Sequence, residues 1–176
     1  YVLYLIDDLS FSYTSDVVRI DMIVYSVSLP TVGFVYAILQ ISAVVGRLFW
    51  GAIADRVAGA SPLLVGIGIA TAVFTTLVGA MDATWSIWGI SIVSFLVGVT
   101  SSGWNGLFFS ELVRFAPEGQ TGDAAAALQF ATLSGVTIVP VAFGFVVTAS
   151  GSYLVAFAAA GALVLVGAIQ FGLSLR

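Results

Sequence analysis

The sequence has no cysteine, no histidine and no lysine among its 176 residues. Without cysteine there is no disulfide framework and no thiolate to act as a metal ligand or nucleophile. Without histidine the commonest metal and haem ligand is missing, and without lysine no Schiff base can form with retinal or pyridoxal phosphate. We therefore expect no metal site, no cofactor and no enzymatic activity.

Charged residues are also scarce, at 8% of the chain against 60% hydrophobic residues. A soluble domain carries roughly a quarter of its residues as charged side chains. The few charges give a formal net charge of −4 and are spread through the loops, so nucleic-acid binding is not expected. A surface this apolar needs a lipid bilayer as its solvent.

The apolar residues form five long runs, and each exceeds the roughly 20 residues that a helix needs to cross the hydrocarbon core. Four of the five contain no ionisable side chain. The expected fold is an all-α, polytopic transmembrane bundle of five helices over residues 29–176. Its expected spans are residues 29–53, 61–81, 85–110, 124–149 and 152–175.

Arginine positions predict the orientation of the bundle in the membrane. Arg47 is the single charge inside a span, and it lies near one end, where its long side chain can reach the interface. With the loop at Arg56 placed in the cytoplasm, alternation puts four of the five arginines on that side, as the positive-inside rule expects. The four are Arg47, Arg56, Arg114 and Arg176. We therefore expect a multi-pass protein of the plasma or inner membrane with a cytoplasmic C-terminus.

The sequence pattern indicates secondary structure least clearly for residues 1–28. Residues 1–9 resemble the last turns of a truncated transmembrane helix, and no signal peptide precedes them. Residues 11–29 mix charges with apolar residues that fit one face of a helix or of a strand. We expect an extracytoplasmic loop or an interfacial segment there, and we expect the chain to be a fragment.

A motif of glycine and charges ends the first span, where Gly51, Ala54, Asp55 and Arg56 form the pattern Gly-x-x-Ala-Asp-Arg. Gly51 can let a neighbouring helix approach closely. Asp55 can face the positive end of a nearby helix, and Arg56 can hold the membrane boundary. An ordinary capped, charged turn between two helices is the alternative interpretation.

The motif resembles the loop motif of the major facilitator superfamily, which recurs between the second and third helices of each six-helix half. The match is partial, because Gly59 comes one residue late and Ala60, Ser61 and Pro62 replace the basic run of the family pattern. The spans resemble helices eight to twelve of such a transporter, in its C-terminal half, with residues 1–9 as the end of helix seven. The resemblance implies a secondary active transporter that moves a small solute by alternating access.

The resemblance also implies that helices seven, eight, ten and eleven line a cavity near mid-membrane. Amides are costly in hydrocarbon unless they have a partner or face water. The candidate substrate-binding residues are Tyr36, Gln40, Ser101, Asn105, Gln129 and Thr132. Packing between helices is the alternative role of each. These residues are neutral, which disfavours a strongly charged solute being held by this part alone, and no span carries a mid-depth carboxylate for proton coupling.

Glu111 lies three residues before Arg114, a spacing that lets the two side chains pair on one helix face. Arg47 and Arg56 are the other basic residues within its reach. A latch between cytoplasmic helix ends, broken as the transporter opens inward, is the functional interpretation, and a solvated end charge is the alternative. The gating candidates are Gly51, Asp55, Arg56, Glu111 and Arg114.

Two functions remain open. The first is the transporter, coupled to an ion or proton, with a missing N-terminal half or a second copy of the chain as its partner. The second is a non-transporting membrane subunit or scaffold that packs its helices against a partner protein.

Overall fold

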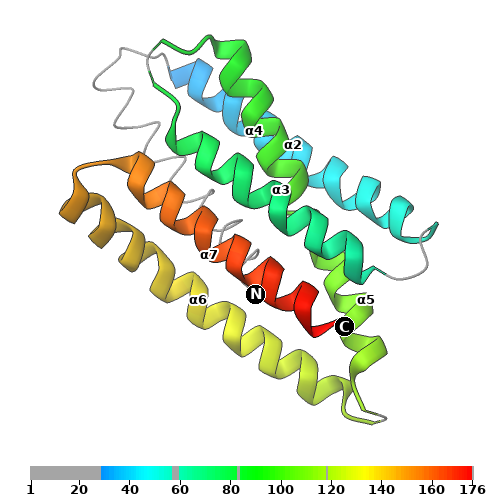
Figure 1. Ribbon diagram of the computed structural model, residues 1–176. Coiled ribbons are helices and arrows are strands. Elements are labelled where there is room, and N and C mark those ends of the chain that lie inside the picture. The colour runs from blue at the N-terminus through cyan, green and yellow to red at the C-terminus, as the bar shows by residue number, and fades with distance from the viewer. Residues whose placement is uncertain (1–28, 57–59, 83, 118, 176) are drawn as a thin grey trace.

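The helices follow the apolar runs of the sequence. The computed structural model describes residues 29–56, 60–82, 84–117 and 119–175, and these are helical apart from short turns, with no strand among them (Figure 1). The helices are α2 (Leu29–Ala54), α3 (Ser61–Gly79), α4 (Ile87–Ser101), α5 (Asn105–Phe115), α6 (Thr121–Ser150) and α7 (Tyr153–Ser174). The expected all-α fold is confirmed, and the predictions for residues 1–28 lie outside the described residues.

Five stretches of the described chain are long and apolar enough to cross a membrane, with α4 and α5 counted as one interrupted crossing. Large apolar side chains point outward from them, and Leu48, Phe130 and Val141 are each more than 70% exposed. Apolar surface on this scale is not found on soluble monomers. The chain is therefore a multi-pass membrane protein.

The long helices lie side by side, packed in the order α6, α7, α3, α4 and α2 (Figure 1). The short α5 contacts α2, α3 and α6. One end of the bundle contains α5 together with the end of α2, the start of α3 and the end of α7 (Figure 1). We call this the α5 end.

The turn at the opposite end is longer than the expected three residues. It occupies residues 80–86, because the side-chain oxygen of Ser86 accepts the N–H of Gly89 at 3.1 Å and so begins α4 there. Within the turn, the Asp82 carboxylate accepts the hydroxyl of Thr84 at 2.5 Å and its backbone N–H at 2.8 Å. These two hydrogen bonds hold the pKa of Asp82 below its ordinary value, and the bond from the Thr84 hydroxyl has the larger effect.

The expected span over residues 85–110 is not one helix. α4 ends at Ser101, Ser102 to Trp104 form turns, and α5 begins at Asn105. α5 then continues to Phe115, so Glu111 lies inside a helix rather than after one.

α2 and α4 approach each other closely at Gly46. A Cβ atom at Gly46 would lie 2.5 Å from the carbonyl oxygen of Val99 and 2.8 Å from its Cα. The expected place for such an approach was Gly51, where a Cβ would meet nothing within 4 Å. Five residues turn a helix by about 140°, so Gly51 points away from the side of α2 that packs on α4.

Gly46→Ala is expected to destabilise the protein by about 1–3 kcal/mol, because overpacking against rigid backbone atoms costs this much. Gly33→Ala is the matched control on the same helix, since a Cβ there meets nothing within 4 Å. It should leave stability unchanged or raise it by up to about 1 kcal/mol through helix propensity. Unfolding by SDS titration in mixed micelles measures both, and equal effects would contradict the close approach at Gly46.

Candidate functional site

The break between α4 and α5 frees backbone carbonyls, and two side chains of α2 bind them. The indole of Trp50 donates its Nε1–H to the carbonyl oxygen of Val99 at 2.8 Å, and Arg47 donates its Nε–H to that of Ser102 at 3.4 Å. Gly103 leaves room for the indole, because a Cβ there would collide with the Trp50 ring. Unpaired backbone groups are costly inside a membrane, so the two donors stabilise the break.

The polar candidates of α2 bond to each other. Gln40 donates from Nε2 to the hydroxyl of Tyr36 at 2.8 Å, one helical turn away. Tyr36 is 36% exposed and Gln40 is half-buried. The amide thus has a partner on its own helix.

The remaining candidates lie at the helix break and on α6. Ser101 is buried at the end of α4, and Asn105 begins α5 with its side chain outside the described part of the chain. On α6, Thr132 is buried and Gln129 is exposed. Because α6 packs on α7 and α5 whereas α2 packs on α4 and α5, the two groups of candidates lie in different parts of the bundle.

Other hydroxyls of α6 bond back to their own helix. Ser134 donates to the carbonyl oxygen of Phe130 at 2.8 Å, and Thr137 donates to that of Leu133 at 3.0 Å. Such bonds let a hydroxyl face lipid without loss. These two residues therefore need no role in binding.

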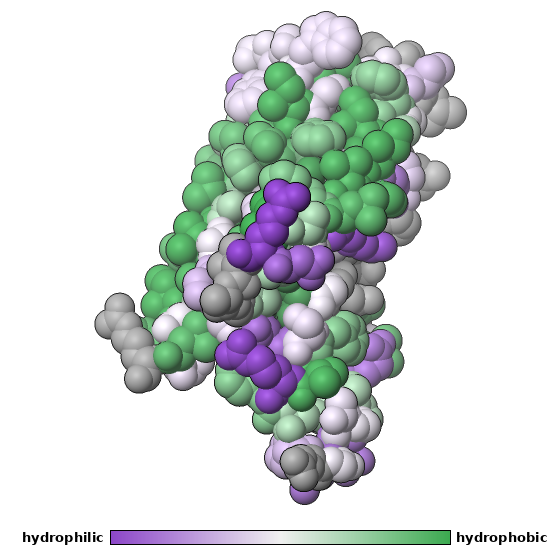
Figure 2. All heavy atoms as spheres, turned by 90° about the vertical axis from the view of Figure 1, so that its right-hand side faces the viewer, coloured by the Kyte–Doolittle hydropathy of each residue, from purple (hydrophilic) through white to green (hydrophobic). Residues whose placement is uncertain are grey.

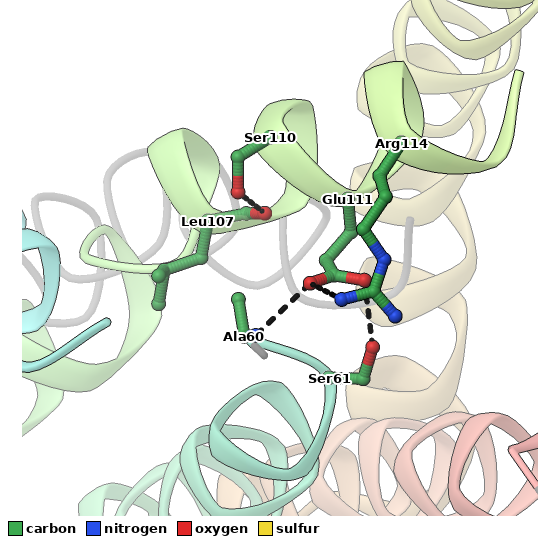
Figure 3. Close-up of polar contacts among 6 residues, drawn as sticks. All are labelled: Ala60, Ser61, Leu107, Ser110, Glu111 and Arg114. Carbon is green, nitrogen blue, oxygen red and sulfur yellow. Dashed lines mark hydrogen bonds and ion pairs between the residues drawn. The ribbon is translucent and has the colours of Figure 1, made fainter. Parts of the chain in front are cut away.

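Glu111 is a buried carboxylate at the α5 end, 6% exposed. Its Oε1 accepts the backbone N–H of Ala60 at 2.9 Å, and its Oε2 accepts the hydroxyl of Ser61 at 2.8 Å (Figure 3). Ala60 is the N-cap residue of α3 and has no side-chain oxygen to cap the helix. A carboxylate from α5 therefore caps α3, where the positive end of the helix dipole favours a negative charge.

The predicted pair of Glu111 and Arg114 is present. Arg114 Nη1 lies 3.5 Å from Glu111 Oε1, and the Arg114 side chain is 57% exposed. Its guanidinium also lies over the ring of Phe115, 4.9 Å from the centroid. An ion pair with one exposed partner contributes little, so the hydrogen bonds to α3 are the stronger interactions of the carboxylate. In the described part of the chain, Arg47 and Arg56 do not pair with Glu111.

Asp55 and Arg56 are exposed after the end of α2. Among the described residues, neither makes an ion pair, and the acid at the start of α3 is Glu111 rather than Asp55. The expectation that Asp55 would face the positive end of a helix is therefore not met within these residues. The acid that contacts the start of α3 is Glu111, which lies 50 residues after Ser61 in the chain.

An apolar cluster joins the capped start of α3 to the helix break. Its buried members are Ala60, Leu64, Ile67, Trp104 and Leu107. Trp50 packs against this cluster while it also donates to α4. The cap and the break thus share one packed region at the α5 end.

Five apolar crossings, one of them broken beside polar side chains, define a polytopic membrane protein. The sequence model of the Major Facilitator Superfamily matches residues 2–176. The chain belongs to this superfamily, whose members are membrane transporters. Comparison with curated proteins and with solved structures found no match.

Glu111→Ala is expected to destabilise the protein by about 2–3 kcal/mol, because it leaves the first turn of α3 without its charged acceptor. Ser61→Ala removes one of the two bonds and should cost about 1 kcal/mol. Arg114→Gln should cost less than about 1 kcal/mol, as expected for an exposed partner. SDS-titration unfolding measures all three, and an effect of Arg114→Gln as large as that of Glu111→Ala would show that the ion pair is the main interaction.

Proposed function

We propose that the protein is a secondary active transporter that moves a small solute by alternating access. Membership of the superfamily supports transport as its class of function. The observation that carries the proposal is the broken crossing α4–α5, whose freed carbonyls are bound by side chains of a neighbouring helix. In transporters, interrupted helices mark the places where backbone groups face the transported solute.

The solute site is proposed on α2, at the break and on α6. Tyr36 and Gln40 offer a phenol and an amide from α2, and Ser101 and Asn105 flank the break. Gln129 and Thr132 would complete the lining from α6. A six-helix N-terminal half or a second copy of the chain would close the cavity, and residues 1–28 would contribute the end of helix seven.

The gate is proposed at the α5 end, where the Glu111 carboxylate joins α5 to α3. Arg114 would steady the carboxylate, and Gly51, Asp55 and Arg56 would form the loop of the gate. The gate opens when α5 moves away from α3, which breaks both hydrogen bonds of Glu111 at once. Arginines favour this end as the cytoplasmic one, in a plasma or inner membrane, with a cytoplasmic C-terminus.

Coupling to an ion or proton is proposed to involve carboxylates outside the membrane-spanning helices described above. Among the described residues, the crossings carry Glu111 near the end of α5 and Asp123 in the first turn of α6, and no acid at mid-depth. A titrating group at mid-depth would therefore come from the partner half.

Gln40→Leu is expected to lower kcat/KM for the transported solute about tenfold, which is the effect of losing about 1.4 kcal/mol of hydrogen bonding. Thr132→Val should act in the same direction from α6. Thr148→Val is the matched control, because this exposed hydroxyl only bonds the carbonyl oxygen of Gly144 on its own helix. Uptake into proteoliposomes measures the three variants, and wild-type kinetics in both Gln40→Leu and Thr132→Val would remove the proposed site.

The gate can be tested by cysteine labelling, because these 176 residues contain no cysteine of their own. Leu107→Cys places a thiol in the buried cluster next to Glu111, where Leu107 is 4% exposed. Adding Glu111→Gln, which removes the charge but keeps the size, should speed labelling by a membrane-impermeant maleimide several-fold. Adding Val113→Ala, at an exposed residue of α5, is the control and should not change the rate. Equal rates in all three proteins would rule out a latch at Glu111.

A further inference from the structure

Arg47 carries a full positive charge within a membrane-crossing helix. It lies seven positions before Ala54 at the end of α2, which places it about 10 Å inside that end. Its side chain is exposed on the described part of the chain. An ionisable group at such a position is costly, and it is found where it pairs with a charge or lines an ion or substrate pathway.

No carboxylate among the described residues neutralises Arg47, since the ion pair there joins Glu111 and Arg114. Its one hydrogen bond runs from Nε to the carbonyl oxygen of Ser102 at 3.4 Å. This bond orients the guanidinium and leaves the charge and the terminal N–H donors available. The group is therefore held in place without being neutralised.

Arg47 lies on the same side of α2 as Tyr36, which is exposed, and Gln40, which is half-buried. The steps from Tyr36 to Gln40 and from Gln40 to Arg47 are four and seven residues, so the three form one row along the helix. We call it the α2 row. The exposed apolar residues Ile41 and Leu48 lie on a different side, about 100° around the helix. The exposed Val44 lies four residues after Gln40, so the α2 row carries one apolar residue between its polar members.

The helix break places two helix ends near Arg47, the negative C-terminal end of α4, where Ser102 accepts its hydrogen bond, and the positive start of α5. α5 begins three residues after Ser102, and its N-cap residue Trp104 makes no side-chain cap bond. The start of a helix favours an anion, and a guanidinium offers two parallel N–H donors that match a carboxylate. Figure 2, which views the molecule from the right-hand side of Figure 1, shows a few hydrophilic residues among a largely apolar surface.

We propose that Arg47 binds the carboxylate of a small organic anion, with Gln40 and Tyr36 contacting the rest of the solute further along the α2 row. The proposal rests on the proposed transport function and assigns it a substrate class. One arginine without an ion-pair partner among the described residues matches one negative charge. The neutral lining expected from the sequence is thus incomplete, because a residue that looked like a membrane-interface anchor supplies the charge.

The test uses the protein produced from its complete gene, reconstituted in vesicles of neutral phosphatidylcholine so that no anionic lipid competes. The probes are labelled acetate, pyruvate and succinate, with glycerol as a neutral solute. Arg47→Gln should lower kcat/KM for the carboxylates at least about tenfold, mainly through KM, and leave glycerol unaffected. Arg47→Lys should recover part of the loss, because it keeps the charge and loses the two-pronged geometry.

Trp50→Phe is the matched control, because it removes the other hydrogen bond from α2 to the broken helix and keeps Arg47. Equal losses for all solutes in Arg47→Gln and Trp50→Phe would mean that Arg47 only holds the helices together, and would overturn the proposal. Transport of glycerol that no carboxylate inhibits would overturn it too, while transport itself would stand.

A second readout does not depend on transport. Pyruvate should raise the thermal unfolding temperature of the wild-type protein in neutral detergent and leave that of Arg47→Gln unchanged. No rise in the wild-type protein would overturn the site even if uptake occurs. An equal, Arg47-dependent rise with inorganic phosphate, or with an anionic phospholipid, would overturn the assignment to carboxylates.

Discussion

The start of α3 depends on a carboxylate supplied by another helix. Ala60 provides no cap, and Ala60 and Ser61 are buried at the α5 end. Glu111 satisfies it with two hydrogen bonds and with charge that complements the helix dipole. Since α3 lies between α7 and α4 in the bundle, the contact that fixes its start also sets the position of its neighbours.

The helix break is stabilised in a similar way, by side chains that reach across from a neighbouring helix. Trp50 and Arg47 of α2 replace the hydrogen bonds that a continuous helix would make for the carbonyl oxygens of Val99 and Ser102. Trp104 follows the break and packs in the cluster next to the capped start of α3. A movement of α5 therefore disturbs the cap and the break together, as the proposed gate near the proposed binding site requires.

Helix positions and local pairs could be predicted from the sequence, because they depend on residues a few positions apart. The spacing of Glu111 and Arg114 predicts their ion pair, and the apolar runs predict the crossings within a few residues. The capping of α3 by Glu111 could not be predicted, because it joins residues about 50 positions apart. For the same reason the close approach was expected at Gly51 but occurs at Gly46, since one sequence does not show which side of a helix meets its neighbour. The roles of the candidate site residues stay proposals, whether they are argued from the sequence or from the structure.

The charge of Arg47, which no carboxylate of the described residues pairs with, has a consequence for energetics across the membrane. A charge that crosses a full potential of 100 mV exchanges about 2.3 kcal/mol with the electric field. With an anion bound as proposed, the guanidinium and its ligand form a neutral pair, and the loaded protein changes conformation with little electrical work. Without the anion, the same rearrangement moves a net positive charge through part of the field. The membrane potential then acts on the return of the empty carrier rather than on the solute-carrying step.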